Sequence, residues 1–329
     1  MKVAIIGATG VVGRTMLKVL EARLGDRIHK IWVAASERSV GQPLPWASGE
    51  VVVERISTVW KYRPDVALFS AGSKVSNEWG PRFASAGTYV IDNSSRWRME
   101  DNVPLIVPEV NGDVLGPAHR LIANPNCSTI QLVVPLSVLH RLFGLERVYV
   151  STYQAVSGSG WKGLQQLHAE RTGQSVVHPA YPVPIHGNCV PLCGELEGEY
   201  TTEEWKLIRE SRKILGLPAL QVIPHAIRVP IEIGHSETVT VETRHPVDIP
   251  RLTDALKSVP GIKVNDSLPT PRNTAGQDAI FVGRIRRHPF TPNGVMMWIV
   301  ADNLRKGAAT NAVQILELIY QKGWINASK

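Results

Sequence analysis

The sequence predicts an α/β protein of two domains. Residues 1–125 alternate short apolar strands with helix-length segments, and the rest of the chain carries longer strands of alternating polarity. A length of 329 residues also exceeds what a single core usually holds. Hydrophobic residues make up 43% of the chain and charged residues 20%, a composition that is typical of globular proteins and argues against disorder.

The first domain has the pattern of a parallel sheet. We expect strands at 2–6, 31–35, 66–70 and 89–91, with a helix at 14–24 after the first strand. Such alternation indicates βαβ units, whose right-handed crossovers give an open, doubly wound sheet. An apolar stripe predicts a helix at 307–322 that returns to this domain. The predicted division is therefore residues 1–126 with 305–329, and residues 127–304.

The second domain is expected to be α+β. Its strands are predicted at 147–154, 221–227, 237–243 and 296–302, and its helices at 162–172, 202–215 and 250–258. Residues 238–243 alternate between polar and apolar side chains, as in a sheet with one wet face. The Pro- and Gly-rich stretch 175–196 is expected to be irregular.

Several functional classes are disfavoured by composition. No run of about 18 apolar residues is present, so no membrane span is expected. Three cysteines form an odd, sparse set that indicates a reducing cytoplasm rather than a disulfide scaffold. Cys189 and Cys193, with His178 and His186 nearby, lack the spacing of a structural zinc site, so no metal is expected.

A formal net charge of +7 permits binding to nucleic acid, membranes or small anions. The densest basic run, residues 284–288, has no interleaved aromatic residues and is interpreted as a solvated strand face. Dispersed positive charge favours a phosphorylated small-molecule substrate over a polyanion, so neither a nucleic acid nor a membrane is an expected partner.

A glycine-rich loop follows the first predicted strand and leads into a helix. Its glycines allow a tight turn and the close approach of a pyrophosphate to the helix N-terminus, as in Rossmann-type dinucleotide-binding domains. The alternative is a glycine turn that binds no ligand. The predicted contacts are Gly7, Thr9, Gly10, Val11, Val12 and Gly13.

The end of the second strand favours NADP over NAD. A carboxylate at this place would bind the ribose hydroxyls of NAD, whereas Ser36, Arg38 and Ser39 can donate to a 2′-phosphate. Glu37 lies one residue past the usual acidic position.

Cys127 is the candidate nucleophile. Asn126 can cap the apolar helix that follows, which would place Cys127 in the first turn, where the helix dipole favours a thiolate. Pro135 is expected to bend this helix. The alternative for Cys127 is a small buried thiol with a purely structural role.

Many separate stretches, in order along the chain, resemble the aspartate-semialdehyde dehydrogenase family. The matching stretches are Gly7–Gly13, Asp92–Ser95 with Arg98, Val107–Asn111, Asn124–Thr129, Ser151–Gly158, Glu203–Lys206, Arg228–Pro230, Gly234–Glu237 and Asp302–Ala309. The resemblance implies a homodimeric enzyme of lysine, threonine and methionine biosynthesis. Arg96, Trp97 and residues 178–193 depart from the family pattern.

The resemblance also implies a reaction in which NADPH and L-aspartyl 4-phosphate give L-aspartate 4-semialdehyde, NADP⁺ and phosphate. A cysteine thioester divides one difficult reduction into two steps. By this match Cys127 is the nucleophile, His235 its acid/base partner and Gln154 the residue that orients the substrate. His235 follows Gly234 at the start of a strand, an exposed place, where an ordinary pKa near 6.5 would suit proton transfer. Without the family resemblance, His235 would be interpreted as a polar residue in a turn. Gln154 would be interpreted as a residue at a strand end whose side chain bonds to the backbone.

Three cations match the anion sites of the family. Arg228 would clamp the substrate carboxylate, and Arg98 and Lys206, with Asn126, would hold phosphate. Glu203, three residues before Lys206 on one helix, would meet the substrate ammonium, although such a pair is commonly a surface pair. Thr201 and Glu204 form the capping box that would start this helix. The nicotinamide-side contacts are Ser157, Gly158 and Asn303.

Three other functions compete with this interpretation. N-acetyl-γ-glutamyl-phosphate reductase shares the thioester chemistry, but its usual Cys-Tyr-Pro differs from Cys127-Ser128-Thr129 here. A non-catalytic NADPH-binding paralogue would be expected to lack Cys127 or His235, and neither is lost. A nucleic-acid binder is favoured by net charge alone.

Overall fold

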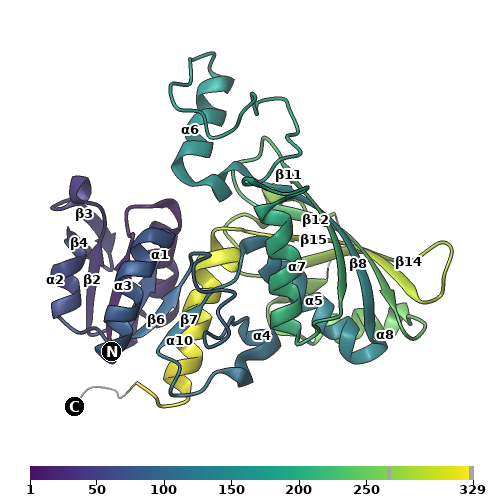
Figure 1. Ribbon diagram of the computed structural model, residues 1–329, viewed down its shortest axis with the longest axis horizontal. Coiled ribbons are helices and arrows are strands. Elements are labelled where there is room, and N and C mark those ends of the chain that lie inside the picture. The colour runs from purple at the N-terminus through teal and green to yellow at the C-terminus, as the bar shows by residue number, and fades with distance from the viewer. Residues whose placement is uncertain (265–267, 326–329) are drawn as a thin grey trace. The chain divides into compact units, whose positions relative to one another are not determined.

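The computed structural model describes residues 1–264 and 268–325. The chain divides into two compact units, Met1–Pro125 with Ala308–Lys329, and Asn126–Gly307 (Figure 1). Each unit contains its own sheet.

The first unit is built on a seven-stranded sheet in which every pair of neighbours is parallel except the β3–β4 hairpin. In spatial order its strands are β3 (Pro43–Trp46), β4 (Gly49–Glu54), β2 (Lys30–Ala34), β1 (Lys2–Ile6), β5 (Val66–Phe69), β6 (Tyr89–Asp92) and β7 (Leu121–Ala123). The strand order reverses at β1, and open α/β sheets usually bind their ligands at the carboxyl ends of the strands beside such a reversal.

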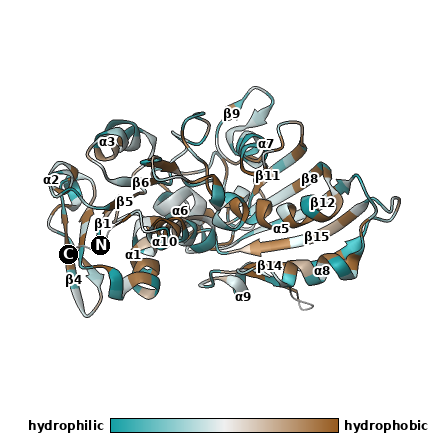
Figure 2. Cartoon of the chain, turned by 90° about the horizontal axis from the view of Figure 1, so that it is seen from below, coloured by the Kyte–Doolittle hydropathy of each residue, from teal (hydrophilic) through white to brown (hydrophobic). Residues whose placement is uncertain are grey.

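Helices cover both faces of this sheet. Val3 and Ile5 of β1 pack in one apolar cluster with α1 (Val11–Leu24) and α10 (Asn311–Gln321). Ala4 and Ile6 point the other way and pack with α2 (Ile56–Lys61) and α3 (Ser73–Ser85) (Figures 1 and 2). Because both faces of these strands are buried, their sequences are continuous apolar runs. The predicted doubly wound class is confirmed.

The glycine loop after β1 has no room for side chains at two positions. Gly7 has φ +90°, and a Cβ there would collide with the carbonyl of Ser70. A Cβ at Gly13 would collide with the carbonyl of Gly7. The six-residue spacing of these glycines therefore lets α1 begin directly against the end of β1.

The second unit is built on a six-stranded mixed sheet. In spatial order its strands are β11 (Gln221–Arg228), β8 (Leu145–Gln154), β12 (His235–Thr243), β15 (Gly294–Ala301), β14 (Ile280–Arg287) and β13 (Ile262–Val264). The helices α5 (Cys127–Phe143), α7 (Thr202–Leu215) and α8 (Ile249–Lys257) pack on one face, and α5 contacts β8, β12 and β15 (Figure 1). The four predicted strands of this unit are confirmed, and the basic run 284–288, interpreted as a strand face, falls largely within β14, whereas β13 was not predicted.

Residues 172–195 form the irregular segment that the sequence predicts, and α6 (Gly160–Arg171) anchors it. The Gln166 side chain accepts hydrogen bonds from the backbone of Ala180 and Tyr181, and Glu170 accepts two more from Ile185 and His186 at 2.7 Å each. The segment is therefore held in place without a sheet or helix of its own.

The remaining elements are short. They are α4 (Pro108–Asn111), α9 (Pro271–Thr274), β9 (Leu196–Glu197), β10 (Tyr200–Thr201), the 3-10 turns η1 (Gly25–Arg27), η2 (Glu37–Ser39), η3 (Gly112–Val114) and η4 (Val156–Ser159), and the π-helix η5 (Arg305–Thr310). The helix predicted over 307–322 is thus η5 followed by α10. Within residues 1–264 and 268–325, no helix is both long and apolar enough to cross a membrane. The basic side chains of the β14 run, Arg284, Arg286 and Arg287, are exposed, as predicted.

Candidate active site

Cys127 is the first residue of α5 and is partly exposed, as the sequence predicts. Asn126 occupies the N-cap position, but the expectation that its side chain caps the helix is wrong. Its amide donates instead to Ser128 Oγ at 2.7 Å and to Glu203 Oε1 at 2.6 Å. The side chain of Asn126 therefore does not cap the first turn of α5. The backbone N–H groups of this turn point towards the N-terminal end of the helix, where the thiol of Cys127 lies.

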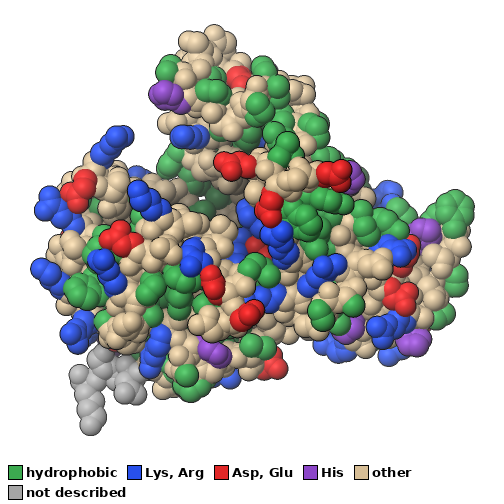
Figure 3. Space-filling model, in the orientation of Figure 1, with side chains coloured by type: hydrophobic (Ala, Val, Ile, Leu, Met, Phe, Trp, Pro, Cys, Tyr) green, Lys and Arg blue, Asp and Glu red, His purple; other side chains and the backbone are tan. Residues whose placement is uncertain are grey.

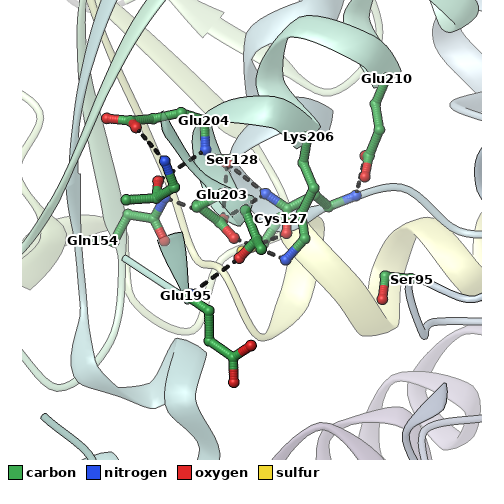
Figure 4. Close-up of polar contacts among 12 residues, drawn as sticks. Ser95, Cys127, Ser128, Gln154, Glu195, Glu203, Glu204, Lys206 and Glu210 are labelled. Carbon is green, nitrogen blue, oxygen red and sulfur yellow. Dashed lines mark hydrogen bonds and ion pairs between the residues drawn. The ribbon is translucent and has the colours of Figure 1, made fainter. Parts of the chain in front are cut away.

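Glu203 is the centre of the polar network beside Cys127 (Figure 4). Its side chain comes from the first turn of α7 and is buried. It accepts hydrogen bonds from Asn126, from Gln154 Nε2 at 3.2 Å and from Lys206 Nζ at 3.0 Å. The network joins α5, α7 and β8, and brings four of the predicted site residues together around one carboxylate.

The charge of Glu203 is strongly compensated. Burial acts to raise the pKa of this carboxyl, but the nearby Lys206 cation, the Asn126 amide and Arg228 outweigh burial and lower the pKa to about 2. The carboxylate is therefore ionised at neutral pH. Because Glu203 is only 7% exposed, the alternative of an ordinary surface pair with Lys206 is wrong.

The start of α7 is fixed by the predicted capping box. Glu204 N donates to Thr201 Oγ1 at 3.2 Å, and Thr201 N donates to Glu204 Oε2 at 2.7 Å. The other oxygen of Glu204 accepts from Ala226 N of β11 at 3.1 Å. This second contact ties the cap to the sheet and so sets the position of Glu203.

Glu210 is a site residue that the sequence reasoning missed. It is buried on α7, and its carboxylate accepts the backbone N–H of Asn126 at 2.7 Å. Glu210 lies seven residues after Glu203, so both acids project from the same side of the helix. That spacing is the signal by which it could have been found.

His235, at the start of β12, is fully buried rather than exposed as expected. Its Nδ1 accepts the backbone N–H of Ala155 at 3.1 Å. Because a backbone N–H can only donate, Nδ1 carries the lone pair and Nε2 carries the hydrogen. Among the residues that the structure describes, Nε2 has no hydrogen-bond partner.

The expectation of an ordinary pKa for His235 is also wrong. Burial and the neighbouring Arg228 cation lower the pKa to about 3, against smaller opposing effects of Glu203 and Gly234. The imidazole of the free protein is therefore neutral at pH 7 and offers one buried N–H.

Arg228, at the end of β11, is buried beside His235. Its Nη1 donates to the carbonyl of Ala155 at 2.7 Å, and the guanidinium lies 5.8 Å from the ring centre of Tyr181. Its Nε has no partner within the described part of the chain. A Cβ added at Gly158 would lie 2.8 Å from Arg228 Nη1 and 3.4 Å from His235 Nε2, so a side chain there would displace the Arg228 guanidinium.

Ser157 and Asn303, two of the predicted cofactor contacts, bond directly to each other. Asn303 Nδ2 donates to Ser157 Oγ at 2.9 Å, and Asn303 Oδ1 accepts from Gly234 N at 2.8 Å. These bonds tie η4 to the residue before His235.

Arg98 belongs to the first unit and is buried there, with Nη2 donating to the carbonyl of Asn93 at 2.8 Å. The neighbouring Asp92 is buried at the end of β6 and accepts from Ser76, and from both the backbone and the side chain of Ser94. Burial raises the pKa of Asp92, although these bonds and the Arg98 cation lower it in part.

The glycine loop and the end of β2 also lie in the first unit. Gly7 N and Ala8 N both donate to the carbonyl of Ala34, which pins the loop to the second strand. The first-turn N–H groups of Val11, Val12 and Gly13 precede the first helical hydrogen bond, from Arg14 N to Gly10 O.

Beyond β2, Ser36 and Arg38 are exposed and Ser39 is half-buried. Glu37 forms an ion pair with Arg55 at 3.0 Å. The carboxylate that follows β2 in the sequence is therefore already bonded to an arginine.

The other cysteines do not share the surroundings of Cys127. Burial raises the pKa of the Cys193 thiol to about 12, so Cys193 is not a thiolate, and Cys189 is exposed. In residues 1–264 and 268–325, no three His, Cys, Asp or Glu side chains are grouped so that they could hold a metal ion.

Comparison with known proteins places both units in one family. Residues 2–118 match the model of the semialdehyde dehydrogenase NAD binding domain, and residues 136–306 match the semialdehyde dehydrogenase dimerisation domain. The chain thus carries a nicotinamide-cofactor domain and a dimerisation domain.

Comparison with full-length relatives supports the same family. The aspartate-semialdehyde dehydrogenase of Aquifex aeolicus is 43% identical over 98% of this chain and 99% of its own, and that of Bacillus subtilis is 39% identical over 96% of both. The crystal structure of aspartate semialdehyde dehydrogenase II complexed with ASA from Vibrio cholerae superposes with a TM-score of 0.93 at 40% identity, covering 97% of this chain and 98% of that one. The chain belongs to the aspartate-semialdehyde dehydrogenase family.

Proposed function

We propose that this chain uses Cys127 to convert L-aspartyl 4-phosphate and NADPH into L-aspartate 4-semialdehyde, NADP⁺ and phosphate. The observation that carries the proposal is the position of Cys127 at the N-terminus of α5, beside the buried network of Glu203. A thiol there is both reachable and surrounded by groups that hold a charged substrate.

Cys127 performs the covalent step. Its thiolate attacks the acyl carbon, the bond to the phosphate oxygen breaks, and phosphate leaves with the electron pair. The first-turn N–H groups of α5 stabilise the thiolate and the oxyanion that forms in this attack. NADPH, when bound, supplies the hydride that reduces the resulting thioester. The thiohemiacetal oxyanion then collapses to aldehyde and regenerates the thiolate.

His235 acts as a hydrogen-bond donor in this sequence. Ala155 fixes the tautomer so that Nε2 carries the hydrogen, and Nε2 is the atom without a protein partner. The neutral imidazole can therefore donate a hydrogen bond from Nε2 to the oxygen that gains charge when the thioester is reduced, and the oxyanion that it stabilises can collapse directly to aldehyde and thiolate. Gln154, bonded to Glu203, orients the substrate beside the thiol.

The first unit fits NADP. The close packing of Gly7 and Gly13 leaves a cradle of backbone N–H groups at the start of α1 for a pyrophosphate. The exposed Arg38, with Ser36 and Ser39, suits a 2′-phosphate, while Glu37 is paired with Arg55. We assign NADP binding to residues 1–126 with 305–329, the loop contacts being Gly7, Thr9, Gly10, Val11, Val12 and Gly13, completed on the nicotinamide side by Ser157, Gly158 and Asn303.

Two anion sites bind the substrate. Arg228 has a buried Nε without a described partner, and this is the kind of group that a substrate carboxylate would satisfy. Arg98, Lys206 and Asn126 hold phosphate, and Glu203 meets the substrate ammonium. Lys206 is also bonded to Glu203, which links the phosphate and ammonium sites.

Residues 127–304 carry catalysis and dimerisation. The face of their sheet opposite α5 presents Tyr149, which is 40% exposed, and the tilted pair of Tyr153 and Trp298 with ring centres 5.8 Å apart. An apolar sheet face of this kind needs a cover, and a second copy of the chain provides one in a homodimer. The three free cysteines agree with a cytoplasmic enzyme.

The competing functions are less well supported. A buried acid positioned for an ammonium suits an amino-acid substrate better than an N-acetylated one. On the face shown in Figure 3, Lys and Arg side chains are dispersed, with acidic side chains between them. This distribution does not resemble the continuous basic groove of a nucleic-acid binder.

Replacing Cys127 by serine is expected to abolish turnover while NADPH still binds, because a serine hydroxyl at this site has no comparable activation. Steady-state assays with aspartate semialdehyde, phosphate and NADP⁺ would be paired with NADPH fluorescence titration. Cys189→Ser, at an exposed thiol, is the control and should keep full activity. Near-normal turnover by Cys127→Ser would exclude the thioester mechanism.

Removing the Arg38 side chain is expected to raise the Michaelis constant for NADP⁺ by about tenfold or more and to leave that for NAD⁺ nearly unchanged, because only NADP⁺ carries the 2′-phosphate. The measurement is a cofactor-saturation series for Arg38→Ala. Lys18→Ala, which removes an exposed cation elsewhere in the same unit, is the control. If both constants move together, Arg38 does not contact the 2′-phosphate.

Substitutions at the two anion sites should change the Michaelis constants of different substrates. Charge-assisted hydrogen bonds are worth about 1.5–3 kcal/mol each, so each loss should cost at least about tenfold. Arg228→Lys should raise the semialdehyde constant with little change for phosphate, because an ammonium cannot reproduce the paired bonds of a guanidinium. Arg98→Ala and Lys206→Ala should raise the phosphate constant, and Arg98→Ala is the cleaner test because Lys206 is bonded to Glu203. The opposite pattern would reverse the assignment.

A charge at the centre of the aromatic sheet face is expected to weaken the homodimer. Light scattering at micromolar concentration should report a dimer for the wild type and a larger monomer fraction for Tyr149→Asp. Val114→Asp, at an exposed residue of the first unit, should remain dimeric. A monomeric wild-type protein would contradict the proposal.

A further inference from the structure

A second acid lies behind the site and is used by none of the steps above. Glu237 follows His235 by two residues on β12 and is fully buried. Within the described residues, neither of its carboxyl oxygens meets a donor at hydrogen-bond distance and angle. A buried polar group without a partner is unusual enough to need an explanation.

The sheet register places Glu237 on the face that α5 covers. Side chains two residues apart on a strand share a face, so Glu237 points to the same side as His235. Glu237 pairs in register with Thr152 of β8, whose hydroxyl accepts a hydrogen bond from Gln154 at 3.3 Å. The acid therefore lies in the layer between the sheet and the helix that begins with Cys127.

Gln131 connects these elements. It is fully buried on α5, one helical turn after Cys127, and its Nε2 donates to the carbonyl of His235 at 3.3 Å. Its Oε1, like the carboxyl of Glu237, has no partner among the residues that the structure describes. The Gln131 side chain is also within hydrogen-bonding reach of the Glu237 carboxyl, and this contact partly lowers the pKa that burial raises.

Gln131 Oε1 and the carboxyl of Glu237 are both buried acceptors without a described donor, and their side chains lie within hydrogen-bonding reach of each other. A proton between them would satisfy both groups. An ionised carboxylate at this place would be a buried charge with no cation to compensate it, which is among the most unfavourable arrangements in a protein. A neutral carboxylic acid instead has an O–H that can donate to Gln131 Oε1. In agreement, burial raises the pKa of Glu237 well above its ordinary value, and the opposing effect of Gln131 is smaller.

We propose that Glu237 is a positioning residue of the active site: as a neutral acid it donates to Oε1 of Gln131, whose Nε2–H in turn holds the carbonyl of His235. The two hydrogen bonds connect β12 to α5. They fix the position of the His235 imidazole relative to the first turn of α5, which carries Cys127. The proposal rests on the proposed function in so far as His235 serves the reaction on Cys127.

The variants separate a neutral acid from an ionised one. Glu237→Gln keeps a buried donor for Gln131 Oε1, so it should retain kcat within about threefold and leave the pH profile of kcat/KM unchanged. Glu237→Leu and Gln131→Leu each break the connection and should lower kcat by about tenfold, with smaller changes in the semialdehyde constant. Because both act through one connection, the double variant should lose little more than either single variant.

An infrared measurement tests the proton itself, whether or not the enzyme turns over. The wild type at pH 7 should show a protonated-carboxyl C=O stretch that is lost in Glu237→Gln and retained in Glu146→Gln, which alters an exposed acid on β8. If wild-type turnover with aspartate semialdehyde is absent but this band is present, the proposed function fails and the neutral acid stands. Lack of the band, loss of turnover in Glu237→Gln, or wild-type kcat in Glu237→Leu would each overturn the proposal.

Discussion

The arrangement of the candidate site depends on one buried carboxylate, that of Glu203. A buried charge is tolerated only when hydrogen bonds and opposite charges surround it, because losing its hydration costs several kcal/mol. Here the compensation comes from three places in the unit, through Asn126 at the N-cap of α5, Gln154 on β8 and Lys206 on α7 itself. Each partner is thereby held at a fixed distance from the others. The location of Cys127 follows from this network because Asn126 immediately precedes it.

Two titratable groups of the second unit have different protonation states. Glu203 is ionised beside Lys206, whereas His235 is neutral because burial and Arg228 oppose its protonation more strongly than the charge of Glu203 favours it. Under the proposed function, Glu203 meets a cation and His235 donates a hydrogen bond. A pair of titratable groups whose pKa values are driven apart in this way is a general mark of a catalytic centre.

Local sequence pattern was sufficient for four strands of each sheet, the glycine loop and the capping box, because period, glycine spacing and cap chemistry act over a few residues. Strands β3, β4, β7 and β13 were not predicted. The errors concern packing between distant segments. Asn126 suits a cap by type, but Glu203, 77 residues away, takes its amide. Gly234-His235 reads as an exposed strand start, but the fold buries both residues. Glu237 was missed for the same reason, whereas Glu210 could have been found from its seven-residue spacing to Glu203 on one helix.

The first unit is made of two segments from opposite ends of the chain, and this affects the order in which the units can fold during synthesis. One face of its sheet is covered by α1 together with α10, and α10 contributes Ala312, Ile315, Leu316 and Ile319 to the apolar cluster there. During translation, however, all of Asn126–Gly307 leaves the ribosome before α10 does. The second unit can therefore complete its core first, while the earlier-synthesised sheet still exposes part of an apolar face. The unit at the N-terminus would be the last to finish folding, and aggregation before that point would be its main hazard.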